Sequence, residues 1–304
     1  MRYLIIMFLA FTTMIQAGEV TFNWGTAKGE IGYYNHNVKN YADEENPMGP
    51  LSFDFDAEGN IYISDTFNKR IQKFSNTGKF LDSFGGEHPA FAFPGDLKVF
   101  QGSLFFIDSL RQKIIKCSLK GELLGEFGGL AKGKGKIIQA HILEIGQDGT
   151  FFIGDRGKNR ILIFSRRGKF RGSFQWNLNG FHVSHSGEII FLDYRENKGY
   201  FVRKRGFPHT QGNERLISVG QSNGINAFVV GQDANSQITL SFGDAKSSKV
   251  RFLTIDSTGK IRPGISVPYC NDIRWARVTR KGELAAMKYN PHTAPKGKVR
   301  IIFR

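Results

Sequence analysis

Four aspartates that recur at matching places are the first residues in this sequence whose type and spacing could do chemistry. Three of them end an apolar run and are followed, five positions later, by a basic residue. These pairs are Asp65 with Arg70, Asp108 with Lys113 and Asp155 with Arg160, and Asp193 holds the same place in a weaker copy. Turn-forming aspartates recur along a chain, whereas a catalytic carboxylate usually does not. We therefore predict that they hold turns through hydrogen bonds and local ion pairs.

Short strands are the elements that must position these aspartates. Residues 49–86 alternate between β-forming runs and turn residues. The predicted strands are 51–56, 61–64, 70–74 and 80–84. Four antiparallel strands of this length cannot bury both faces alone, so copies of the unit have to stack beside it.

Further copies of this unit follow along the chain. They lie at 107–129, 153–176, 185–202, 237–261 and 281–304, where the fifth copy is faint and the sixth stops after its third strand. Four strands in every forty residues or so predict an all-β fold, a six-bladed β-propeller of four-stranded antiparallel blades. Residues 19–25 read as the fourth strand that the last copy lacks. We expect this N-terminal strand to pair with the last blade and close the ring.

One stretch resembles a known family. The string DAEGNIYISDTFNKRIQKFSNTGKFLDSFG at 56–85 is similar to an NHL repeat, and the similarity weakens beyond about residue 205. The resemblance implies a six-bladed β-propeller. It leaves the function open, because NHL propellers include enzymes, protein-binding modules and RNA-binding modules.

His141 is the strongest lead to an enzyme. The string AHILEIGQDGTFFIGDRGKNRILIF at 140–164 is similar to a metal-binding blade of the peptidyl-hydroxyglycine amidating lyases. That resemblance implies a zinc ligand at the start of strand one, with two more from other blades. The matching positions here are Pro50 or Gly49, Gly95 and Asn179. A catalytic zinc normally has three protein ligands, so the set is incomplete.

A lactonase-like propeller would need carboxylates and amides around calcium. The candidates near the blade starts are Asn179, Asn226, Asn271 and Asp272. Since acids are scarce among them, we predict no catalytic residue, no metal ligand and no cofactor. A bound zinc or calcium ion is predicted only under the alternative hypothesis that the protein is an enzyme.

The chain is strongly basic. It carries 42 Lys and Arg against 27 acids, a net charge of +15. Such an excess favours acidic partners. The propeller topology would gather several basic and aromatic residues around one mouth of the channel. The residues of this predicted rim are Arg111, Lys132, Lys134, Lys136, His141, Arg156, Lys158, Tyr194 and Arg195.

The N-terminus reads as a secretory signal. Residues 1–17 combine a basic start, an apolar run and a small residue at the expected cut, and the run is shorter than the ~20 residues of a membrane span. A retained anchor is the alternative. We predict an exported protein, periplasmic or extracellular, with a single propeller domain over 18–304. Cys117 and Cys270 fall in blades two and six, too far apart for a disulfide.

These observations predict a monomeric, exported binding or scaffold module. It would engage a protein, an acidic polymer or a lipid surface through the basic rim. The alternative is a hydrolase or lyase that uses the channel and a bound metal. An RNA-binding propeller is the third hypothesis, which the signal sequence disfavours.

Overall fold

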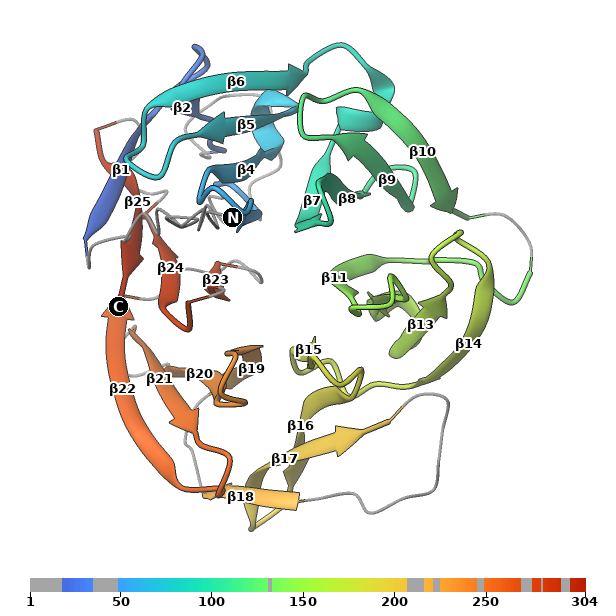
Figure 1. Cartoon of the computed structure of the whole chain (residues 1–304), viewed down its shortest axis with the longest axis vertical. Helices are drawn as coiled ribbons and strands as arrows, with labels where there is room; N and C mark the ends of the chain where they lie inside the picture. Colours follow the sequence, from blue (N-terminus) through green and yellow to red (C-terminus); the bar gives the residue numbers. More distant parts are fainter. Residues whose placement is uncertain are drawn as a thin grey trace, which may run out of the picture.

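A computed structural model describes residues 18–34, 49–130, 133–206, 216–220, 225–244, 249–268, 275–279, 281–290 and 296–304. Six small sheets of these residues stand in a ring around a central channel, which confirms the predicted six-bladed β-propeller (Figure 1). No α-helix occurs in the described ranges. No helix among them is long and apolar enough to cross a membrane. The predicted signal, residues 1–17, lies outside the described residues.

Blades one to three follow the predicted repeat. Blade one is β3 (Ser52–Phe55), β4 (Ile61–Asp65), β5 (Arg70–Phe74) and β6 (Phe80–Gly85). Blade two is β7 (Pro94–Phe100), β8 (Ser103–Asp108), β9 (Lys113–Ser118) and β10 (Leu123–Gly128). Blade three is β11 (Ala140–Ile145), β12 (Phe151–Asp155), β13 (Arg160–Phe164) and β14 (Phe170–Gln175). Three 3-10 turns accompany them: η1 (Thr66–Asn68), η2 (Pro89–Phe91) and η3 (Arg156–Lys158).

Blades four to six keep the same order. Blade four is β15 (Phe181–Val183), β16 (Ile189–Arg195), β17 (Gly199–Arg205) and β18 (Leu216–Gly220). Blade five is β19 (Ile225–Gln232), β20 (Ile238–Asp244), β21 (Lys249–Ile255) and β22 (Ile261–Pro268). Blade six is β23 (Ala276–Val278), β24 (Leu284–Lys288) and β25 (Lys298–Phe303).

The two ends of the chain close the ring. β1 (Glu19–Trp24) pairs antiparallel with β25, from Glu19 opposite Ile302 to Asn23 opposite Lys298. A two-residue strand, β2 (Glu30–Ile31), pairs parallel with β1 and extends this sheet to five strands. Alternate side chains of β1 are buried, and the ring of Phe22 lies 4.5 Å from that of Phe74 in blade one. Closure therefore protects the edge of β25 and joins blade six to blade one.

Burial falls from the inner strands to the outer ones. All five residues of β4 are buried, whereas β6 is largely exposed. Aromatic side chains fill the space between neighbouring blades: the ring of Phe127 in blade two lies 4.8 Å from Phe151 in blade three. Cys117 is a buried free thiol whose pKa burial raises to about 12, in keeping with its predicted place in the core. Cys270 lies outside the described residues.

Candidate active site in the central channel

The first strand of every blade places one residue at the same level of the channel. This residue pairs with the second residue of strand two, or with the third in blade two, where strand two begins one residue earlier. We call these six positions the channel ring: Asp54, Lys98, Glu144, His182, Gly231 and Arg277. Five of the six carry an ionisable side chain, and Gly231 carries none.

Glu144 links two other members of the ring. Its Oε1 lies 3.2 Å from Nζ of Lys98, and its Oε2 lies 3.2 Å from Nδ1 of His182. The carboxylate is fully buried, while Lys98 and His182 keep a small exposed fraction. A buried carboxylate requires such partners because an unpaired charge is costly away from water. Blades two, three and four thus contribute one residue each to a single charged cluster.

Arg277 also belongs to a second cluster, with Ser52 and Asp96. These two residues stand two positions before the ring members Asp54 and Lys98 in the same strands. The guanidinium of Arg277 donates to Oδ1 of Asp96 at 2.7 Å and to Oγ of Ser52 at 2.9 Å. Ser52 donates to the same Asp96 oxygen at 2.7 Å, and the other oxygen accepts from the backbone N–H of Leu143 at 2.8 Å. All three side chains are buried. The cluster ties blades one, two, three and six together at the channel wall.

The environment of His182 keeps its ring neutral. Burial, together with the nearby charges of Lys98 and Arg277, lowers the pKa of His182 to about 3. Nδ1 lies 3.2 Å from Oε2 of Glu144 but has no hydrogen-bond partner in this structure. A neutral imidazole has one ring nitrogen without a hydrogen, and that nitrogen can accept a proton. The neutral imidazole thus stands beside a buried carboxylate at the channel wall.

A cavity of about 430 Å³ opens beside this cluster. Its wall includes Asp54, Lys98, Glu144 and His182 from the channel ring, together with His185 and apolar side chains. Turn residues between strands one and two of several blades form its mouth, which places it at the turn end of the channel. The volume falls within the ~300–1,000 Å³ typical of small-ligand sites.

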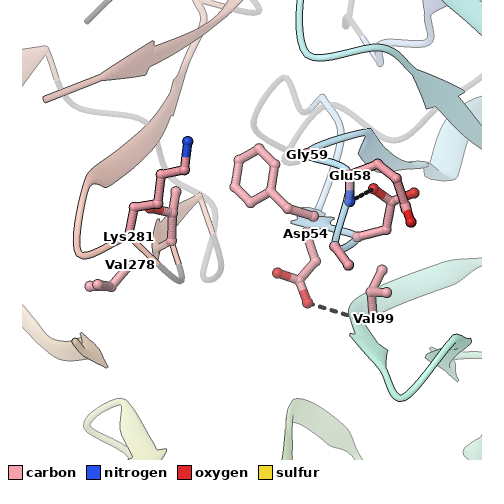
Figure 2. A pocket seen from close by; sticks show the side chains of 10 residues that line it. Asp54, Glu58, Gly59, Val99, Val278 and Lys281 are labelled. Atoms are coloured by element: carbon pink, nitrogen blue, oxygen red, sulfur yellow. Dashed lines mark hydrogen bonds between the residues drawn. The ribbon is translucent and has the colours of Figure 1, made fainter. Parts of the chain in front are cut away.

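A smaller cavity of about 150 Å³ adjoins it between blades one, two and six. Figure 2 shows Lys281 and Val278 on one side of this cavity and Glu58 and Asp54 on the other. Asp54 borders both cavities, and its Oδ2 accepts from the backbone N–H of Val99 at 2.8 Å. Asp54 is therefore held in place at the junction of the two spaces.

The predicted rim residues lie at the other end of the channel. Arg111 forms ion pairs with Asp108 and Glu126, and Arg195 lies 3.7 Å from Asp193. The guanidinium of Arg156 lies 3.4 Å from Nε2 of His141. The remaining described members are Lys134, Lys136, Lys158 and Tyr194, which are partly or fully exposed, and Lys132 lies outside the described residues.

The repeated Asp–basic pairs hold in two blades and differ in a third. Asp65 pairs with Arg70 at 2.6 Å, and Asp155 pairs with Arg160 at 3.0 Å. The predicted pair of Asp108 with Lys113 is wrong: Arg111 pairs with Asp108, and Lys113 pairs with Glu126. The physical reason is that Asp108 Oδ1 accepts the backbone N–H groups of residues 110 and 111, which draws the Arg111 side chain onto the carboxylate.

In blade four, Asp193 pairs with Arg203 at 3.2 Å, and with Arg195 at the longer distance given above. All four aspartates thus have basic partners, and the first three also accept backbone N–H bonds from loops. This agrees with a turn-holding role.

His141 has no zinc partners at the matching positions. It occupies a bulge in β11, and Gly95 occupies the equivalent bulge in β7. Among the described residues no group of three or more His, Cys, Asp and Glu could hold a metal ion. Asn271, Asp272 and the side chain of Asn226 lie outside those residues. The sequence patterns considered above did not predict the channel ring, although each member stands just before the turn between strands one and two.

No protein-family model and no curated protein matches this sequence. Solved structures do match it. A streptogramin B lyase is 13% identical, with a TM-score of 0.54, over 94% of this chain and 98% of that one. The calcium-binding protein regucalcin from Agrobacterium tumefaciens is 12% identical, with a TM-score of 0.56, over 83% and 89% of the two chains.

A gluconolactonase from Xanthomonas campestris is 14% identical, with a TM-score of 0.56, over 84% of this chain and 85% of that one. At these identities the likeness is one of fold. It supports the six-bladed propeller, while the resemblance to NHL repeats remains a prediction.

Proposed function

We propose that this protein is an enzyme, a hydrolase or lyase that acts on a small polar molecule in the 430 Å³ cavity by acid–base chemistry. The observation that carries the proposal is the cluster of Lys98, Glu144 and His182 at the cavity wall. The similar structures include a protein named as a lyase and one named as a gluconolactonase, which favours an enzyme over the binding module expected from the sequence.

His182 is the proton-transfer group of the proposed site. Its neutral ring is the form that can take a proton from a substrate or from an attacking water. A pKa near 3 makes it a weak base. The imidazolium formed on proton uptake would have its Nδ1 3.2 Å from Oε2 of Glu144.

Lys98 is the electrostatic group. Its ammonium ion borders the cavity and is held by Glu144, so it is fixed in place before a substrate binds. Negative charge that develops on a substrate oxygen would be stabilised by this fixed positive charge. Lys98 and His182 together would serve two reaction types. In a hydrolase His182 activates water, and in a lyase it removes a proton beside a carbonyl group.

The test is turnover of a defined panel. Glucono-δ-lactone and other γ- and δ-lactones would be offered to the purified protein, with acid release and product mass as readouts. We expect turnover by the wild type. The His182→Gln substitution should lower kcat by about 10²–10⁴-fold, the usual contribution of acid–base catalysis. Lys98→Met should also lower kcat.

His185→Gln is the matched control, because His185 borders the same cavity and has no described contact with Glu144. Its activity should stay within about threefold of the wild type, since His182 and not His185 is the proposed proton-transfer group. Unchanged kcat in folded His182→Gln protein would contradict the proposal. So would the absence of both turnover and any ligand-dependent rise in Tm across the panel.

A further inference from the structure

One face of the propeller is basic over blades two to four. We define this loop face by the loops between strands two and three and the connections between blades, residues 109–112, 129–130, 133–139, 156–159, 176–180 and 194–198. Its described residues include seven Lys and Arg but a single acid, Glu196. No carboxylate of the described residues forms an ion pair with Lys134, Lys158 or Lys198. Their charge is therefore available to a partner.

The same loops expose large apolar side chains. Leu110 is 61% exposed, Leu130 is 52%, Leu178 is 38% and Tyr194 is 56%. Leu110 and Tyr194 each directly precede an arginine, Arg111 and Arg195. Of the eight large hydrophobic side chains that are exposed among the described residues, these four share one basic face.

Hydrogen bonds join these loops into one continuous surface. The backbone N–H of Arg156 donates to the carbonyl of Gln139, and the N–H of Trp176 donates to the carbonyl of Asn159. The side chain of Asn177 donates to the carbonyl of Leu192, two residues before Tyr194. Gln112 Oε1 accepts the N–H of Ala140, so the loop of Leu110 is tied to the connection that follows Leu130.

We propose that the loop face binds the surface of an anionic lipid membrane. The lysines and arginines would contact headgroup phosphates, and the leucines and Tyr194 would enter the boundary between headgroups and acyl chains. A nucleic acid would satisfy the charge, but it offers no apolar phase to exposed leucines such as Leu110 and Leu130. The pairing of aliphatic and basic side chains is what selects a lipid surface.

Docking in this way leaves the channel cavity open. The cavity is bordered by turns between strands one and two, which lie at the opposite end of the channel from the loop face. Membrane binding and turnover should therefore be separable, and a variant of the loop face should retain the activity of the wild type.

The test is co-sedimentation with vesicles of phosphatidylcholine containing 30% phosphatidylglycerol, compared with phosphatidylcholine alone. We expect the wild type to bind the anionic vesicles at least tenfold more tightly. Lys134→Glu with Lys158→Glu should reduce binding at least tenfold. Lys79→Glu with Lys169→Glu is the matched control, because these exposed lysines lie in turns at the opposite face.

The apolar part of the proposal has its own pair of variants. Leu110→Ser with Tyr194→Ser should reduce vesicle binding at least fivefold. Leu81→Ser with Leu124→Ser should leave it unchanged, because these leucines are 43% and 54% exposed on the outer strands β6 and β10. Tm values of all variants within 2 °C or so of the wild type would show that they are folded.

Two outcomes would overturn the proposal. One is that the wild type fails to bind anionic vesicles. The other is that the Leu110 and Tyr194 substitutions have no effect while single-stranded RNA competes fully, which would identify a surface for nucleic acid. Binding that 0.5 M NaCl weakens but does not abolish supports the proposal, because salt screens only the electrostatic part.

Discussion

Arg277 and Asp96 form a buried ion pair of 2.7 Å, although 181 positions separate them in the sequence. Arg277 belongs to blade six and Asp96 to blade two, so the pair reaches past blade one at the channel wall. Ser52 of blade one bonds to both. The pair makes the channel wall depend on ring closure, since these blades meet only when the ring is complete.

Removing one partner of this pair should be costly. We expect Arg277→Met to lower the free energy of unfolding by about 3–5 kcal/mol, because Asp96 would be left as a buried charge without its cation. Urea unfolding followed by tryptophan fluorescence would measure the change. Arg262→Met is the control: Arg262 pairs with Asp256 at 3.4 Å at the surface, and its loss should cost far less than the loss of Arg277. Equal losses in the two variants would refute the structural role assigned to Arg277.

The stability of the protein should fall in mild acid because of His182. Its pKa is about 3 in the folded protein and about 6.5 in an unfolded chain, so between these values the unfolded chain binds the extra proton. The stability contribution is therefore complete above pH 6.5 and is lost as the pH falls toward 3. This single group should contribute at most about 1.4 kcal/mol per pH unit.

The measurement is the free energy of unfolding at pH 7.5 and pH 4.5. His182→Gln should show a smaller loss between the two pH values than the wild type, because the variant lacks the titrating ring. His185→Gln should keep the loss of the wild type, since that side chain is exposed. Identical losses in the wild type and His182→Gln would show that His182 titrates normally.

The strand that closes the ring should be essential to stability. We expect Phe22→Ala to cost about 3–5 kcal/mol, because Phe22 is buried between blade six and blade one and its loss leaves a cavity. Thr21→Ala, at an exposed position of the same strand, should change stability by less than about 0.5 kcal/mol. Size-exclusion chromatography should also detect association through the uncovered edge of β25 in Phe22→Ala. A stable, monomeric Phe22→Ala protein would contradict this account of closure.

The sequence by itself determined the strands, the blades and the closure. Residues 61–64 and 70–74 were predicted from β-forming runs between turn residues, and the structure places β4 and β5 there. The prediction that residues 19–25 complete the last blade was also confirmed. These features are local, because alternation and turn chemistry act over a few neighbouring residues. The repeat of blade five is faint, but its place after four clearer copies was enough to predict a blade there.

Only the tertiary structure decided the candidate site. The charged side chains of the channel ring follow no repeated residue type, so alignment of the copies does not show that Lys98, Glu144 and His182 meet. Their contacts depend on how three separate blades face one channel, and on burial that favours paired charges over single ones. The ion pairs of Asp108 also depended on the tertiary structure. The bend of one loop decided that Arg111 reaches the Asp108 carboxylate, while Lys113 pairs with Glu126.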